Sequence, residues 1–77
     1  MDLRTALGST LRDIRHAEGK TLRDVNKGTY VSIGHLSDIE RGVKDPSYEF
    51  LTIIARNYNI PIHELLRMVA NRLERNN

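Results

Sequence analysis

The chain has 77 residues, no cysteine and a formal charge of +2, from 12 Lys and Arg against 10 Asp and Glu. This length allows one small domain, and the lack of cysteine excludes disulfides, thiol nucleophiles and zinc sites built on cysteine. No apolar stretch is long enough for a membrane span and no export signal is visible, so we expect a cytoplasmic protein without a membrane partner. The small basic excess fits a polyanionic partner, but it also fits an ordinary solvated surface.

The first predicted helix covers about residues 2–17. Apolar residues recur along it every three or four positions, at Leu3, Leu7, Leu11 and Ile14. This spacing places them on one face of a helix. Glu18 and Gly19 are expected to end it, with the glycine near the C′ position.

A short second helix is predicted from Leu22. Thr21 is a favourable N-cap, and Asp24 three residues later comes close to a capping box. Gly28 is expected to break this helix after about two turns.

The third predicted helix covers 33–41, with Ser32 as its N-cap and Gly42 as its stop. The residues expected to point inward from this pair of helices and their turn are Leu22, Val25, Val31, Leu36 and Ile39. Two short helices joined by a tight turn form a helix-turn-helix, whose second helix can enter a DNA major groove. The spacing alone also fits many other small helical bundles.

Two further helices complete an all-α, single-domain prediction for residues 1–77. The turn 45–47 leads into a fourth helix whose inward residues are Leu51, Ile54, Ala55 and Tyr58. Asn59 ends that helix, and Pro61 opens a fifth that runs to about Asn76. Its apolar face consists of Ile62, Leu65, Leu66, Val69 and Leu73. No alternating pattern typical of strands competes with the helices.

The segment 31–42 reads Val-Ser-Ile-Gly-His-Leu-Ser-Asp-Ile-Glu-Arg-Gly. It resembles the recognition-helix block of the Cro/lambda-repressor (Xre-type) helix-turn-helix family, and it is also similar to the Clp-gene-regulator branch. Segments 11–15, 45–47 and 60–66 look like the family's first helix, its loop and its fifth helix. The resemblance spans about residues 7–66. It implies a five-helix lambda-repressor-like DNA-binding domain, with 67–77 as an extension of the fifth helix and with no cofactor or metal.

The resemblance assigns one structural role and two sets of DNA contacts. Arg15 and Glu40 occupy positions that form a buried ion pair in the family, although both could also be solvated surface charges. The candidates for reading base edges are Ile33, Gly34, His35, Ser37 and Asp38. The candidates for phosphate contact are Thr21, Leu22, Arg23, Lys27, Ser32, Arg41 and Lys44.

The base-reading set is chemically unusual. Ile33 could pack on a thymine methyl group and Asp38 could accept from cytosine N4. Asp38 could equally be a solvated or capping acid. No outward residue at the start of this helix is Arg, Gln or Asn, which make the commonest bidentate base contacts. We therefore expect weaker sequence preference, water-mediated contact or readout of DNA shape.

Three residues depart from the family pattern within the predicted motif. Leu22 stands where the family usually has Gln, Asn26 where it has Ala, and Tyr30 where it has Gly. We expect Asn26 to be hydrogen-bonded or exposed, because a buried unpaired amide is costly. We expect Tyr30 to adopt a turn geometry that avoids the positive φ open to glycine.

Apolar residues beyond the predicted core suggest a homodimer built on the fifth helix with help from the fourth. The candidates for this interface are Phe50, Ile53, Leu66, Met68, Val69, Arg72 and Leu73. The alternative is that the fifth helix folds back and covers Phe50 and Ile53 within one chain. A symmetric dimer would present two recognition helices about 34 Å apart to a palindromic site.

These features favour a sequence-specific, double-stranded-DNA-binding transcriptional regulator, bacterial or phage, acting on the nucleoid, with a regulatory protein partner as one route of control. The alternative is a protein-interaction or antitoxin-like module in which DNA binding is secondary. An enzyme is disfavoured, because His16, His35 and His63 fall on separate predicted helices without metal-ligand spacing.

Overall fold

The computed structural model describes residues 1–76 and contains five helices. They are α1 (Leu3–Ala17), α2 (Leu22–Thr29), α3 (Ile33–Glu40), α4 (Tyr48–Asn57) and α5 (Ile62–Arg75). The described residues contain no strand, so the all-α prediction is confirmed. None of these helices is long and apolar enough to cross a membrane. Asn77, the last residue of the predicted domain, lies outside the described residues.

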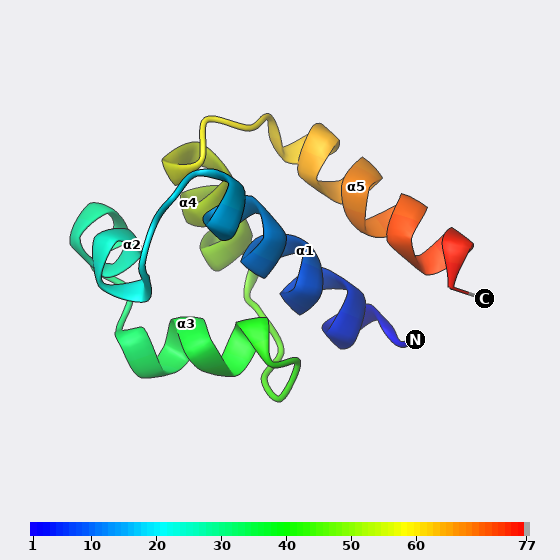
Figure 1. The fold of residues 1–77 in the computed structure, drawn as a ribbon, viewed down its shortest axis with the longest axis horizontal. Helices are drawn as coiled ribbons and strands as arrows, with labels where there is room; N and C mark the ends of the chain where they lie inside the picture. Colours follow the sequence, from blue (N-terminus) through cyan, green and yellow to red (C-terminus); the bar gives the residue numbers. More distant parts are fainter. Residues whose placement is uncertain (77) are drawn as a thin grey trace.

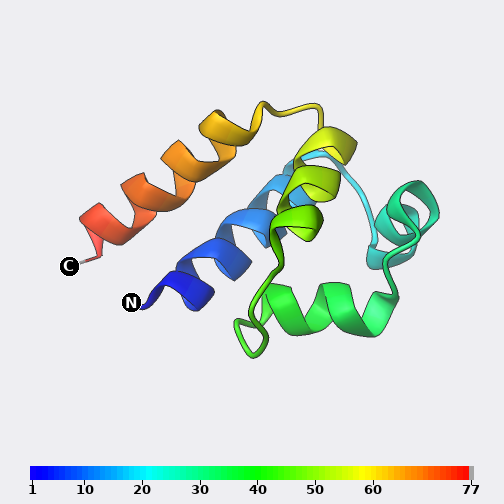
Figure 2. The same cartoon turned by 180° about the vertical axis from the view of Figure 1, so that it is seen from behind.

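Helix α1 lies at the centre of the arrangement (Figures 1 and 2). It packs against α3 and against α5, while α4 contacts α2 and α5. Helix α2 also packs against α3, as the helix-turn-helix prediction requires. Helix α5 lies on the side of α1 away from α3. The outer side of α3 is therefore free of other helices.

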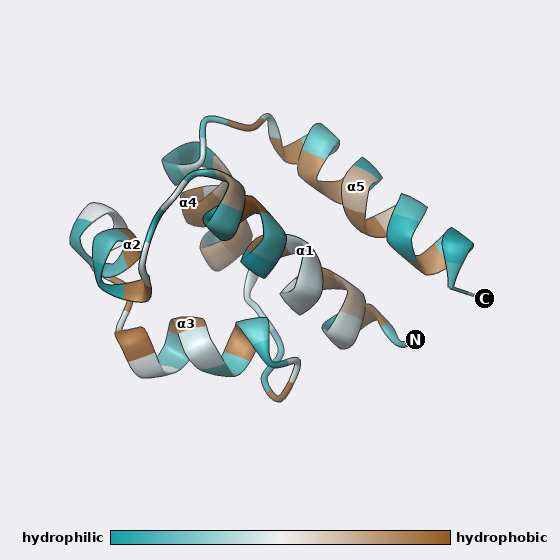
Figure 3. Ribbon diagram, in the orientation of Figure 1, coloured by the Kyte–Doolittle hydropathy of each residue, from teal (hydrophilic) through white to brown (hydrophobic). Residues whose placement is uncertain are grey.

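The core is formed where the apolar faces of the helices meet, and Figure 3 shows the apolar residues of α5 turned toward α1 and α4. The fully buried large side chains are Leu11, Val25, Ile39, Ile54 and Leu65. The inward prediction is wrong for Leu3, Ile62 and Leu66, which are 64%, 41% and 51% exposed. Leu3 and Ile62 stand at the first positions of their helices, where few neighbours cover them.

Small residues of α1 allow the close approach of α3. Ala6 and Gly8 are buried in α1, and Thr10 is buried with its hydroxyl donating to the Ala6 carbonyl at 2.8 Å. A Cβ atom on Gly8 would lie 2.4 Å from the carbonyl oxygen of Ile39 and 2.5 Å from that of Glu40. The end of α3 therefore rests directly on the α1 backbone, which only glycine permits.

Three helices end in the same local motif. At the ends of α1, α3 and α4, the residue after the C-cap has a left-handed backbone: Gly19 (φ 68°), Gly42 (φ 74°) and Asn59 (φ 59°). Its N–H and the next one donate back to the last turn, as from Lys20 to the Arg15 carbonyl at 3.0 Å. The predicted stops at these three positions are confirmed.

Helix α2 does not break at Gly28, contrary to the prediction, and continues to Thr29. A Cβ atom on Gly28 would lie 2.4 Å from the side-chain nitrogen of Asn57 in α4. This glycine makes room for the Asn57 side chain where α2 packs on α4, rather than forming a turn.

Candidate nucleic-acid interface

The turn between α2 and α3 is fixed by side chains. The Asn26 amide donates to the Val31 carbonyl at 2.8 Å, and the Val31 N–H donates to the Thr29 hydroxyl at 3.1 Å. Ser32 then caps α3 by accepting from the His35 N–H at 3.1 Å. Asn26 is hydrogen-bonded, as predicted, and the start of α3 has a defined direction.

Tyr30 adopts the geometry that it was expected to avoid. Its φ is 63°, in the left-handed region, and its N–H donates to the Asn26 carbonyl at 2.7 Å. Tyr30 is the C-cap of α2, and a left-handed residue at a helix end turns the chain away from the helix axis. The side chain of Tyr30 is 92% exposed and packs on neither helix.

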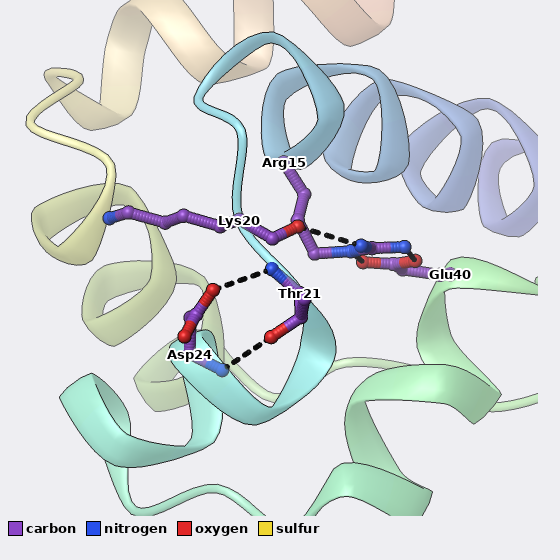
Figure 4. Close-up of polar contacts among 5 residues, drawn as sticks. All are labelled: Arg15, Lys20, Thr21, Asp24 and Glu40. Carbon is purple, nitrogen blue, oxygen red and sulfur yellow. Dashed lines mark hydrogen bonds and ion pairs between the residues drawn. The ribbon is translucent and has the colours of Figure 1, made fainter.

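One guanidinium holds α3 to α1 (Figure 4). The Arg15 Nε and Nη2 atoms donate to the two Glu40 carboxylate oxygens at 2.8 and 3.0 Å, and Nη1 donates to the Lys20 carbonyl at 2.9 Å. Both charged side chains are only about a tenth exposed, at 11% and 10%. The hydrogen bond to Glu40 raises the pKa of Arg15 against the opposing effect of burial. The ion pair implied by the family resemblance is therefore present.

The buried phenol of Tyr58 belongs to the same region. Burial, with a smaller contribution from the Glu40 carboxylate, raises the pKa of Tyr58 to about 12. The Lys20 ammonium lies over its ring, 5.5 Å from the centroid.

The start of α2 is closed by a capping box, also visible in Figure 4. The Asp24 carboxylate accepts from the Thr21 N–H at 2.9 Å, and the Thr21 hydroxyl accepts from the Asp24 N–H at 3.1 Å. The hydrogen bond from the Thr21 backbone N–H is the main cause that lowers the pKa of Asp24. The Thr21 groups predicted to bind phosphate are engaged here, and Leu22 packs its side chain on the core. A phosphate contact at this helix start would therefore use the backbone N–H groups of Leu22 and Arg23.

The outward side of α3 carries four of the five base-reading candidates. Ile33 is 39% exposed, and a Cβ atom on Gly34 would meet nothing within 4 Å. Ser37 and Asp38 are half-buried one turn later. The Asp38 carboxylate forms an ion pair with Arg41, so two residues predicted to contact DNA separately are paired with each other. Their i, i+3 spacing in the sequence was a signal for this ion pair, but whether it forms depends on the side-chain rotamers of both residues.

His35 lies at the edge of this surface rather than on it. Its ring is half-buried and packs edge-on against the ring of Phe50 in α4, with centroids 5.7 Å apart and an interplanar angle of 89°. This contact restricts the ring, so a purine or phosphate contact would need it to turn.

Basic side chains flank the α2–α3 pair. Arg23 and Lys27 on α2 and Lys44 after α3 are exposed. Among the ion pairs of residues 1–76, none includes these three side chains. They are therefore the cations most readily available to a phosphate backbone.

The predicted dimer residues separate into three groups. The expected exposure of Phe50 and Val69 is wrong, because they are 5% and 4% exposed and belong to the chain's own core. Met68 and Leu73 pack on that core with part of their surface, and Arg72 pairs with Asp13 of α1. Only Ile53 and Leu66 keep large exposed apolar surfaces, at 40% and 51%.

An apolar groove of about 420 Å³ lies between the start of α1, the start of α4 and α5. Its apolar lining consists of Leu3, Leu7, Pro46, Tyr48, Leu51, Leu66 and Val69. The ion pair between Arg4 and Asp45, 2.9 Å from Nε to Oδ1, stands among its polar lining residues. Leu3 and Tyr48 were not predicted for this surface, because each is exposed at the first position of its helix, where periodicity gives a weak signal.

A capped helix packed through a tight turn on a second capped helix, with a free outer face, defines a helix-turn-helix protein. Residues 6–68 match the family model described as a helix-turn-helix domain. The chain belongs to this family, and the predicted resemblance is confirmed.

Two similar proteins carry the name ClgR. The chain is 40% identical over 73 residues to the transcriptional regulator ClgR of Mycobacterium tuberculosis, covering 95% of this chain. It spans only 65% of that regulator's length. The crystal structure of the clp gene regulator ClgR from Corynebacterium glutamicum superposes with a TM-score of 0.86 at 37% identity, over 92% of this chain and 76% of that one.

A point mutant of the restriction-modification controller protein C.Esp1396I has the same fold. Its crystal structure superposes with a TM-score of 0.91 over 100% of this chain and 98% of its own, at 17% identity. At this identity the likeness concerns the fold.

Proposed function

We propose that the chain is a sequence-specific regulator of transcription that binds double-stranded DNA with α3 in the major groove. The observation that carries this proposal is the outward side of α3, which is free of other helices while Arg15 and Glu40 fix its far end to α1. A recognition helix needs both properties, because its base contacts depend on a rigid orientation. The similarity to ClgR regulators supports the same function.

In this proposal Ile33, Gly34 and Ser37 face base edges, while Arg23, Lys27 and Lys44 contact phosphates on either side. Because Arg41 and Asp38 form an ion pair with each other, each can contact DNA only when this pair opens. The few polar groups left for bases favour modest direct readout, supplemented by DNA shape. The function places the protein on the nucleoid in the cytoplasm, and a regulatory protein partner stays a prediction.

The test is selection of bound sequences from random duplex DNA, followed by salt titrations of the selected duplex. Each neutralised phosphate should contribute about 0.9 to the slope of log affinity against log salt. Arg23→Ala should lower that slope by about 1 without changing the selected sequence. Arg75→Ala, on exposed α5, is the matched control and should leave the slope unchanged. Failure to enrich any sequence would overturn the proposal and favour the protein-interaction alternative.

We propose further that the protein acts as a homodimer on a palindromic operator, with a second copy covering the groove between α1, α4 and α5. The groove is lined mainly by apolar side chains, and Leu66 and Tyr48 at its edges are 51% and 90% exposed. Its α5 side lies across α1 from α3, so a second copy that packs on α5 can leave both recognition helices free. Exposed apolar area of this kind is typical of interfaces.

Leu66→Glu tests the dimer, because it places a charge in the covered groove. It should shift the protein from dimer to monomer in light scattering and weaken binding to the full palindrome more than binding to one half-site. Asn71→Glu, exposed on the same helix but turned by more than a quarter turn from Leu66, is the control. A wild-type protein that is monomeric at micromolar concentration would exclude this arrangement.

A further inference from the structure

The side chain of Tyr30 contributes nothing visible to the fold. It is 92% exposed, the most exposed of the large apolar residues. Among the hydrogen bonds and ring contacts of residues 1–76, none uses its hydroxyl or its ring. Its φ of 63° is a strained conformation for a bulky residue, whereas glycine adopts it freely.

The turn keeps this strained backbone through other residues. The Tyr30 N–H donates to the Asn26 carbonyl at 2.7 Å, and the Asn26 amide donates to the Val31 carbonyl at 2.8 Å. The Thr29 hydroxyl accepts from the Val31 N–H and donates to the Val25 carbonyl at 2.8 Å. It thereby joins Val31 to the last turn of α2. A glycine at position 30 would satisfy all these bonds with less strain. This chain has a tyrosine here in spite of that cost, and strain of this kind clusters at functional sites.

The position of Tyr30 indicates what the side chain meets. It precedes the N-cap Ser32 by two residues, at the leading end of the helix assigned to the groove. The chain from Tyr30 to Ile33 spans at most about 11 Å, so the exposed side chain of Tyr30 stays close to the end of α3 that would enter the groove. Resting on the proposed DNA-binding function, we propose that Tyr30 donates its phenolic hydroxyl to a DNA phosphate beside the leading end of α3.

A tyrosine contact differs from a lysine or arginine contact in its dependence on salt. The phenol is neutral, so it forms a hydrogen bond to the phosphate but releases no bound cation. Removing the hydroxyl should therefore weaken binding to all duplexes by a similar factor, without changing the salt slope or the selected sequence.

The experiment compares Tyr30→Phe, Tyr30→Gly and the control Asn59→Gly. Asn59 has the same left-handed backbone, at φ 59°, but ends α4 rather than α2. Affinity is measured for the duplex selected by the wild-type protein and for a scrambled duplex, each at several salt concentrations, and Tm is measured for every variant. Light scattering reports the oligomeric state.

Tyr30→Phe should bind both duplexes about tenfold more weakly with an unchanged salt slope. Tyr30→Gly should lose at least as much affinity while its Tm rises by about 4–8 °C, because the strain is relieved. Asn59→Gly should keep wild-type affinity. Loss of binding together with a gain in stability is the signature of a strained contact residue.

Four outcomes would overturn this inference. Wild-type affinity in both Tyr30 variants would show that the side chain meets no phosphate, although DNA binding itself would stand. A changed base preference in Tyr30→Phe would indicate base readout, and a changed oligomeric state with unchanged affinity would indicate a protein contact. If the wild-type protein binds neither duplex, the proposed function fails as well.

Discussion

Replacing Gly8 with alanine is expected to destabilise the domain, although alanine is the better helix former. In a helix interior the exchange normally gains roughly 0.5–1 kcal/mol. Here the new methyl group would lie 2.4 and 2.5 Å from the carbonyl oxygens of Ile39 and Glu40. Neither oxygen can rotate away as a flexible side chain would, so the end of α3 must move.

Overpacking of a core typically costs about 1–3 kcal/mol, and immobile backbone obstacles favour the upper end. After the helix gain is subtracted, Gly8→Ala should lose about 2 kcal/mol of unfolding free energy. For a domain of this size that loss lowers Tm by roughly 8–16 °C. The displacement also strains the contact between Glu40 and Arg15, so DNA affinity should fall with stability.

The assay is urea denaturation followed by circular dichroism, with Gly34→Ala as the matched control. Gly34 lies in the first turn of α3, where a Cβ atom meets nothing within 4 Å, so alanine there should stabilise the domain by roughly 0.4–1 kcal/mol, chiefly by reducing the entropy of the unfolded chain. The two glycines thus predict opposite signs for the same chemical change. A Gly8→Ala protein as stable as the wild type would refute the close approach of α3 to α1.

Three further predictions concern charged and titratable groups. Glu40→Ala should cost about 3–5 kcal/mol in urea denaturation because it leaves Arg15 buried without its partner, whereas an apolar pair (Arg15→Met with Glu40→Leu) should recover most of that loss. Because the pKa of Asp24 is lowered in the folded protein, its contribution to stability is present above the unfolded pKa of about 3.9 and is lost as pH falls through the folded pKa. Asp24→Asn should therefore flatten the acid side of the plot of stability against pH. Because the pKa of Tyr58 is raised, its contribution to stability is present below about pH 10 and is lost as pH rises toward about 12. Tyr58→Phe should therefore reduce the fall of Tm at alkaline pH.

Capping signals made the helices predictable from the sequence. Thr21, Ser32 and Ser47 each accept from the backbone N–H three residues later, as local rules require. Gly28 was misread because a glycine that stops a helix and one that admits a neighbouring side chain look alike in a sequence. Only the approach of Asn57 distinguishes them.

The candidate site was predictable in outline for a similar reason. Helical periodicity identifies the outward side of α3, and the family resemblance supplied the pairing of Arg15 with Glu40. The burial of Phe50 was missed because it depends on the rotation of α4 about its axis and on contact with the His35 ring. The left-handed backbone of Tyr30 was predicted wrongly, although the glycine that the family has at this position was a signal for positive φ. A tyrosine rarely adopts that geometry, and the side-chain bonds that hold the turn are seen only in the structure.

The position of α1 between α3 and α5 has a consequence for synthesis on the ribosome. Leu7 of α1 lines the same groove as Leu66 and Val69 of α5, and Asp13 pairs with Arg72. A nascent chain that has released only α1 to α4 therefore exposes this side of α1 to water and to chaperones. The domain completes its core only after α5 has left the exit tunnel, so we expect the α5-facing side of α1 to stay unpacked until that point of synthesis.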